Sequence, residues 1–168
     1  DEFMLNFERN QSGIRTQMKL LVEITKLVDP HFSTYIESLG PMAFGVCFRW
    51  LLILFKREFP LDVLMQIWEA IFSKYYPNFH LFICIAMILE FKNKILRDKL
   101  EMDQLLVLLN QSADKLDGYT VLQNAEQLYK LFIAIEHKNP VLAGQMHMLL
   151  PEQVKQFPEF HSKRESYG

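Results

Sequence analysis

The stretch from residue 44 to residue 55 is apolar at every position but one, and it constrains the fold more than any other part of the chain. It is too short to cross a bilayer, which takes roughly 20 apolar residues in a helix, so it belongs inside a protein core. Arg49 interrupts it at its centre, and Lys56, Arg57 and Glu58 end it abruptly. Because an unpaired buried charge is costly, we expect Arg49 to be buried against a carboxylate or several backbone carbonyls.

Apolar residues recur at three- and four-residue intervals through most of the chain, and no stretch alternates apolar and polar residues long enough to form a sheet. This pattern predicts an all-α fold, with helices over residues 14–28, 31–39, 42–56, 61–73, 79–97, 101–115 and 119–135. The 79–97 helix is apolar nearly all round in its first half and should be the central, most enclosed one. Asn78 stands where it can cap that helix.

The character of the sequence changes after His137, where Asn139 and Pro140 mark a boundary. We therefore predict one helical domain over residues 1–135 and a C-terminal extension over residues 136–168. The extension contains a candidate short helix over residues 141–150, followed by a polar tail.

The net charge indicates which partners to expect, and the placement of the cysteines indicates which compartment. The net charge of −2 provides no broad cationic field, so neither nucleic acid nor an anionic lipid surface is the expected partner. We expect no secretory leader and no membrane span. Cys47 and Cys84 each lie in an apolar helical run, as free thiols in a reducing compartment do. The sequence thus predicts a cytoplasmic protein that reaches membranes, if at all, through its partners.

The sequence contains no recognisable catalytic device of its own. It has no glycine-rich phosphate loop and no serine in a nucleophile elbow. His80 and Cys84 stand four residues apart on one predicted helix, but two ligands are too few for a zinc site. We therefore predict no catalytic residue, metal or cofactor, and a core or capping role for His80.

Six residues near the arginine-bearing stretch form a candidate structural or partner-binding constellation: Arg49, Trp50, Arg57, Glu58, Trp68 and Glu69. In one interpretation the two indoles pack between helices, and carboxylates such as Glu58, Asp62 or Glu69 neutralise the arginines. In the other, part of the set lines a groove that receives a partner. The sequence leaves both open.

Several motifs of the chain occur in the order and approximate spacing of one known family: Phe48-Arg49-Trp50-Leu51-Leu52, Phe55-Lys56-Arg57-Glu58-Phe59, Val63-Leu64 with Trp68-Glu69, and Phe79-His80-Leu81-Phe82 with Leu89-Glu90. With them the chain resembles the TBC domain, the helical domain of activators of Rab-type GTPases, over about residues 3–132. The matching motifs belong to the C-terminal part of such a domain.

The resemblance implies a two-finger mechanism, in which an arginine of an IxxDxxR motif stabilises charge on the phosphoryl group and a glutamine of a YxQ motif positions water. Neither motif is present. Ile95 and Asp98 fit the first pattern, but Glu101 stands where the arginine is needed, and no tyrosine is followed two positions later by glutamine. Neither Arg49 nor Arg57 inherits a catalytic role, since both belong to later motifs.

We therefore expect a C-terminal lobe of a TBC-type activator that is inactive by itself. Its expected partners are a Rab-family GTPase and the N-terminal lobe of the same domain. The alternative is a non-catalytic helical scaffold or adaptor that binds a Rab or another protein.

Overall fold

The computed structural model describes residues 2–40, 43–73, 76 and 78–136, with side chains from residue 13 onward. Every regular element in this part of the chain is helical: α1 (Glu2–Val28), α2 (Pro30–Ser38), α3 (Gly45–Leu52), α4 (Leu61–Phe72), α5 (Phe79–Glu90), α6 (Lys92–Arg97), α7 (Met102–Ser112), the 3-10 turn η1 (Ala113–Lys115) and α8 (Gly118–Glu136). The predicted all-α fold is confirmed. The candidate helix over residues 141–150 lies outside the described residues.

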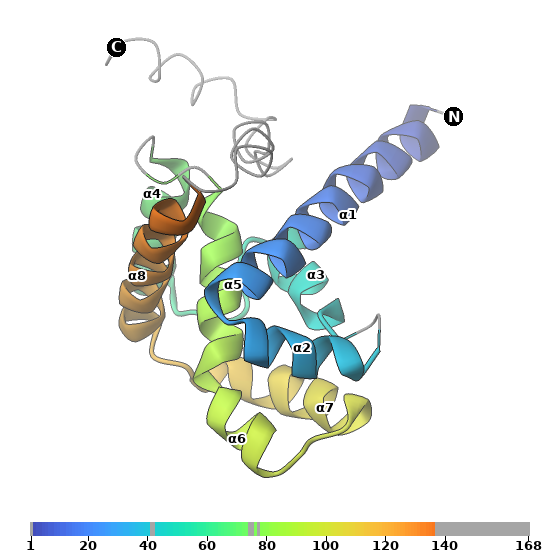
Figure 1. Ribbon diagram of the computed structural model, residues 1–168. Coiled ribbons are helices and arrows are strands. Elements are labelled where there is room, and N and C mark those ends of the chain that lie inside the picture. Colours follow the sequence, from blue (N-terminus) through green and yellow to red (C-terminus); the bar gives the residue numbers. More distant parts are fainter. Residues whose placement is uncertain (1, 41–42, 74–75, 77, 137–168) are drawn as a thin grey trace.

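Helix α5 is the centre of the fold, as predicted (Figure 1). Ten successive side chains, from Phe79 to Ile88, are buried, which is possible only where neighbours cover a helix on all sides. Helices α1, α3, α4 and α8 provide that cover, and α8 makes the most extensive contact. Phe82 of α5 meets Tyr129 and Phe132 of α8 edge to face, with ring centroids 5.2 and 5.5 Å apart.

The first helix is longer than the periodicity indicates, because α1 begins at Glu2 and runs through Ser12 and Gly13. A glycine inside a helix costs only about 1 kcal/mol relative to alanine, which the surrounding residues can offset. The helix therefore does not begin at residue 14, the start that the sequence predicted.

Helix α3 ends at Leu52, four residues before the predicted end, in a left-handed turn. The Phe55 amide donates to the Trp50 carbonyl at 2.9 Å and the Leu54 amide to that of Leu51 at 3.4 Å, the two bonds of a Schellman motif. Leu54 takes the position that glycine usually fills, with φ of 47°, and Phe55 follows with φ of 63°. Both side chains are buried, and that burial compensates the strained backbone.

The predicted 79–97 helix is two helices, α5 and α6, which meet at Phe91. Helix α6 is fixed against α2 by polar contacts. Asp29 caps α2 by accepting from the Phe32 amide at 3.1 Å, and its second carboxylate oxygen pairs with Lys92 of α6. The Tyr35 hydroxyl donates to the Leu100 carbonyl, 2.9 Å away, just beyond α6.

Asn78 does not cap α5 in the way the sequence predicted. It occupies the N-cap position with a left-handed φ of 58°, and its side chain makes no capping hydrogen bond. Asparagine tolerates this conformation better than most residues, so its contribution is to turn the backbone into α5.

His80 is a core residue, in agreement with the predicted role. It is buried on α5, and its Nε2 lies 3.1 Å from Oε1 of the buried Gln17 on α1. Burial lowers the pKa of the imidazole to about 3. His80 is therefore neutral in the folded protein at physiological pH.

The buried histidine predicts acid sensitivity. Below pH 6.5, the ordinary pKa of histidine, the His80 imidazole binds a proton in the unfolded chain but not in the native state. The free energy of unfolding therefore falls as the pH drops from 6.5 to about 3. Between pH 6.5 and pH 5 this site should cost about 1.5 kcal/mol of unfolding free energy. Urea denaturation of the protein and of His80→Gln at both pH values measures it: the variant should lose less, and parallel losses would contradict the assignment to His80.

Candidate functional site

Arg49 of α3 pairs with Glu58, which lies in the turn before α4. The guanidinium Nη2 lies 3.5 Å from Glu58 Oε1, but the Arg49 side chain is 44% exposed whereas that of Glu58 is 3% exposed. The expected carboxylate partner is therefore present, while the expected burial of the arginine is wrong. The buried charge at this site is the carboxylate.

Burial raises the pKa of Glu58 above its ordinary value. The positive charge of Arg49 is the strongest influence in the opposite direction, followed by the backbone amides of Glu58 and Arg57. Within the described residues, Glu58 Oε2 and Arg49 Nε are buried without a hydrogen-bond partner. The pair is thus incompletely satisfied, and the charge of Arg49 only partly offsets the cost of burying the Glu58 carboxylate.

Two buried thiols lie near this carboxylate. Cys84 of α5 is completely buried, which raises the pKa of its thiol well above the ordinary value, and the neighbouring Cys47 and Glu58 raise it further. A thiol in this state is neutral and unreactive at neutral pH. Cys47 and Cys84 therefore act as packing residues between α3 and α5.

Both tryptophans belong to the packed interior: Trp50 lies in the hydrophobic core and Trp68 packs against it. Trp50 is completely buried. Trp68 of α4 is partly buried, and its indole Nε1 donates to the Leu54 carbonyl at 2.9 Å. That bond ties α4 to the left-handed turn that ends α3, although the sequence gives no sign that Leu54 is its acceptor.

The other members of the constellation do not join this network. Arg57, Asp62 and Glu69 are exposed, and none of them forms an ion pair within the described residues. The charge of Arg57 lowers the pKa of Glu58 less than the charge of Arg49 does. Of the six candidates, the structure pairs Arg49 with Glu58, buries Trp50 in the core and bonds Trp68 to the turn that ends α3.

Helix α3 carries an exposed strip beside the ion pair. Phe48 is 37% exposed and Leu52 43% exposed, one turn apart, and the half-exposed Arg49 lies next to them. We call Phe48, Arg49 and Leu52 the α3 strip. Aromatic residues and arginine are enriched at protein interfaces, so the strip is a candidate contact surface.

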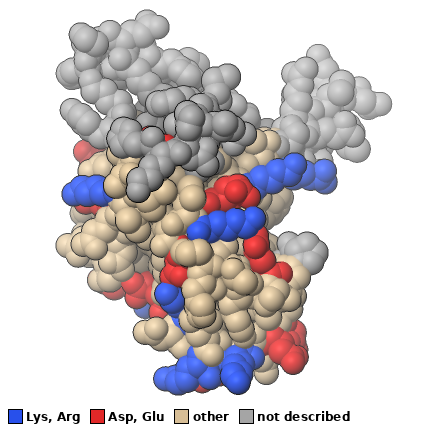
Figure 2. All heavy atoms as spheres, viewed as in Figure 1, with Lys and Arg blue, Asp and Glu red and all other residues tan. Residues whose placement is uncertain are grey.

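The part of the chain that the structure describes holds no group of three or more His, Cys, Asp or Glu side chains placed to bind a metal ion. None of its helices combines the length and apolarity that a membrane span needs. On the face shown in Figure 2, acidic and basic side chains are interspersed rather than gathered into one basic field.

The difference in burial between Arg49 and Glu58 predicts which of the two side chains can be replaced at little cost in stability. Arg49→Met should lower the free energy of unfolding at pH 7 by about 1 kcal/mol or more, since it strands a buried carboxylate. Glu58→Gln should be close to neutral and should cancel most of that loss in the double variant, because a half-exposed arginine stays hydrated. Arg57→Met is the matched control, with an expected change within about 0.5 kcal/mol.

Urea denaturation of the four variants at pH 7 and pH 4.5 tests this. Glu58 has a raised folded pKa, so its favourable contribution is complete below the ordinary carboxyl pKa and is lost as pH rises through the folded pKa. The Arg49→Met loss should accordingly shrink at the lower pH. A Glu58→Gln loss larger than the Arg49→Met loss would instead mean that the arginine is the buried charge.

Comparison with known proteins assigns the chain to a family. Residues 1–96 match the model of the Rab-GTPase-TBC domain. The chain belongs to this family. The matched region includes α3, α4 and α5, and thus the Arg49–Glu58 pair and both tryptophans.

Several curated relatives extend the similarity beyond the matched region. The chain is 38% identical over 133 residues to the GTPase-activating protein GYP7 of Saccharomyces cerevisiae, covering 79% of this chain and 18% of that protein. It is 35% identical over 119 residues to human TBC1 domain family member 16, covering 69% and 16%. Human TBC1 domain family member 17 is 30% identical over 130 residues, covering 77% and 20%. The TBC chain thus spans about a fifth of the length of these relatives.

Proposed function

We propose that this chain is the C-terminal lobe of a TBC domain that activates Rab-family GTPases, and that it supports catalysis without supplying a catalytic residue. The similarity to GYP7, a GTPase-activating protein by name, over four fifths of the chain carries the proposal. We place the TBC-like domain at residues 1–135 and a separate extension at residues 136–168.

The absence of both finger motifs from the sequence limits what the chain can do chemically. A charge-stabilising arginine is typically worth roughly 10³ to 10⁵ in GTPase rate. In the segment that best resembles the arginine motif, Glu101 precedes α7, and its backbone amide donates to Gln104 Oε1 at 3.0 Å. That contact is half of a capping box and serves the start of a helix.

The role left to this lobe is to present a surface on a rigid core. The α3 strip lies on the helix whose buried residues include Trp50, and Arg49 of the strip pairs with Glu58. We propose that Phe48, Arg49 and Leu52 contact either the Rab or the N-terminal lobe, where an arginine and two apolar side chains would be covered together. Such contacts position a partner and do not replace the missing fingers.

A hydrolysis assay tests the inactivity of the chain. With a panel of GTP-loaded Rab proteins under multiple turnover, the chain should leave hydrolysis at the intrinsic rate. Reproducible acceleration that disappears in Arg57→Ala or Arg49→Ala, with the circular dichroism spectrum unchanged, would mean that the catalytic machinery lies in this lobe.

A non-catalytic adaptor is the second candidate, favoured by the same absence of both motifs. A fusion protein distinguishes the supporting lobe from the adaptor. In it, the chain is joined to the N-terminal part of a TBC relative that carries the IxxDxxR and YxQ motifs. A supporting lobe should restore acceleration in the fusion, and Phe48→Ser with Leu52→Ser should weaken it. Binding of the Rab without any acceleration by a folded fusion would favour the adaptor.

A further inference from the structure

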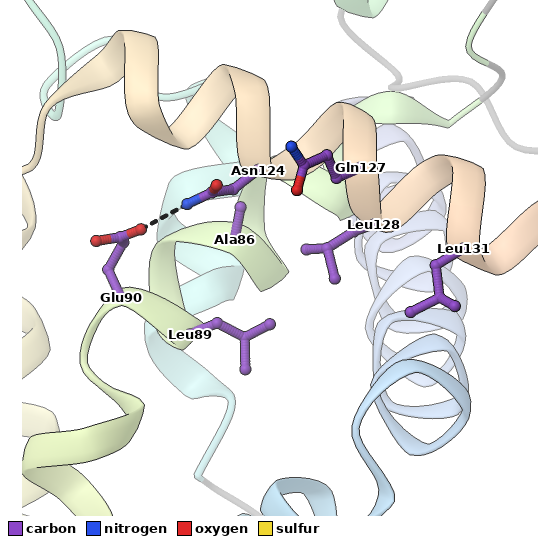
Figure 3. A pocket seen from close by; sticks show the side chains of 7 residues that line it. All are labelled: Ala86, Leu89, Glu90, Asn124, Gln127, Leu128 and Leu131. Carbon is purple, nitrogen blue, oxygen red and sulfur yellow. Dashed lines mark hydrogen bonds between the residues drawn. The ribbon is translucent and has the colours of Figure 1, made fainter.

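A groove runs between α5 and α8, away from the α3 strip. It encloses about 390 Å³ and is lined from α5 by Ala86, Leu89 and Glu90 and from α8 by Asn124, Leu128 and Leu131, among others. Figure 3 shows Leu89, Leu128 and Leu131 pointing into the same space. The groove is therefore formed by the two helices that make the most extensive contact in the fold.

Ala86 and three leucines form the apolar part of the groove, and the polar side chains of Glu90, Asn124 and Gln127 line the rest. Ala86 is buried, Leu89 and Leu128 are partly buried, and Leu131 is 44% exposed. Glu90 and Asn124 bond to each other at 2.7 Å, so two of the three polar side chains are already paired beside the leucines. A leucine-lined groove between two helices suits an amphipathic helix.

We propose that residues 141–150 of this same chain dock in the α5–α8 groove. The described chain ends at Glu136, five residues and about 8 Å of helix beyond Leu131. Residues 137–140 can span up to about 14 Å, and Pro140 disfavours the continuation of α8 through the residue before it. The chain can therefore reverse there and run back along α8 over the groove.

The sequence of the segment fits the groove in pattern and in charge. Leu142, Met146 and Leu149 fall at i, i+4 and i+7, which places them on one side of a helix. Residues 141–150 contain no Asp, Glu, Lys or Arg, so the segment would bring no charged side chain against the leucines of the groove. Because the segment is tethered within a few residues of the groove, its effective concentration is of the order of millimolar, which favours it over a free partner.

Hydrogen exchange with peptide-level mass spectrometry on the whole 168-residue chain tests the docking. Amides of residues 141–150 should exchange at least tenfold more slowly than in the isolated peptide. Leu131→Lys should abolish that protection, and so should Met146→Lys, which leaves the groove intact. Val107→Lys is the matched control, since Val107 is also an exposed apolar helix residue, 52% exposed, outside the groove; it should change nothing.

Three outcomes would overturn the proposal. The segment could exchange at the rate of the isolated peptide in the unmodified protein. It could stay protected in Leu131→Lys while the variant keeps its thermal midpoint, which would place the segment elsewhere. Light scattering could show a dimer that Leu131→Lys converts to a monomer, and the occupant of the groove would then be a second copy of the chain.

Discussion

Replacing Trp50 with alanine should lower the free energy of unfolding by about 3 to 5 kcal/mol, the range for losing a large buried aromatic side chain. Trp50 is completely buried on α3, where that helix packs on α1 and α5. Its indole Nε1 is buried without a hydrogen-bond partner among the described residues, so the loss comes from packing alone. Trp50→Phe should therefore cost much less than Trp50→Ala.

Phe48→Ala is the matched control for this prediction, because Phe48 is an aromatic residue of the same helix with its side chain partly in solvent. Its expected cost is below about 1 kcal/mol. Urea midpoints and slopes for the three variants provide the measurement. Equal losses for Trp50→Ala and Phe48→Ala would show that α3 is oriented differently in the core.

Gly118→Ala should lower the free energy of unfolding by about 2 to 3 kcal/mol, because the first residue of α8 touches the α4 side of the core. A Cβ atom at Gly118 would lie 2.2 Å from Cγ1 of Val63 and 3.1 Å from Cδ1 of Phe59. Both neighbours are buried, so neither can move without displacing others.

A double-mutant cycle identifies the clash. Val63→Ala removes the methyl groups that the new Cβ would meet, so Gly118→Ala should cost less than about 1 kcal/mol in that background. The coupling is read from the free energies of unfolding of the two single variants and the double variant. If the two losses simply add, α8 and α4 do not approach each other at this point.

The sequence predicts helix α5 and its central position well, because a helix that is apolar on every side must be covered on every side. It does not predict where α3 ends. Leu54 and Phe55 extend the apolar pattern, and a leucine in a left-handed conformation is unfavourable in any local description. The turn depends on burial and on the bond from Trp68, 14 residues further along the chain.

The candidate site shows the same division between local and distant information. The sequence indicates, by charge and proximity, that Arg49 and Glu58 can pair. It does not indicate which of the two is buried. That depends on which side of α3 faces α5, and a helix with apolar residues on nearly every side gives little indication of its orientation. Here Cys47, Trp50 and Leu51 face inward, which leaves Phe48, Arg49 and Leu52 at the surface.

The buried thiols of α3 and α5 can report the rate at which the core of this protein opens. Cys47 and Cys84 are both completely shielded from solvent, so an alkylating reagent reaches them only when the two helices separate. At high reagent concentration the labelling rate becomes the rate of that separation, and at low concentration it reports the population of the open state. Repeating the labelling with a bound partner would show whether contact at the proposed surface, the α3 strip, slows the separation of α3 and α5.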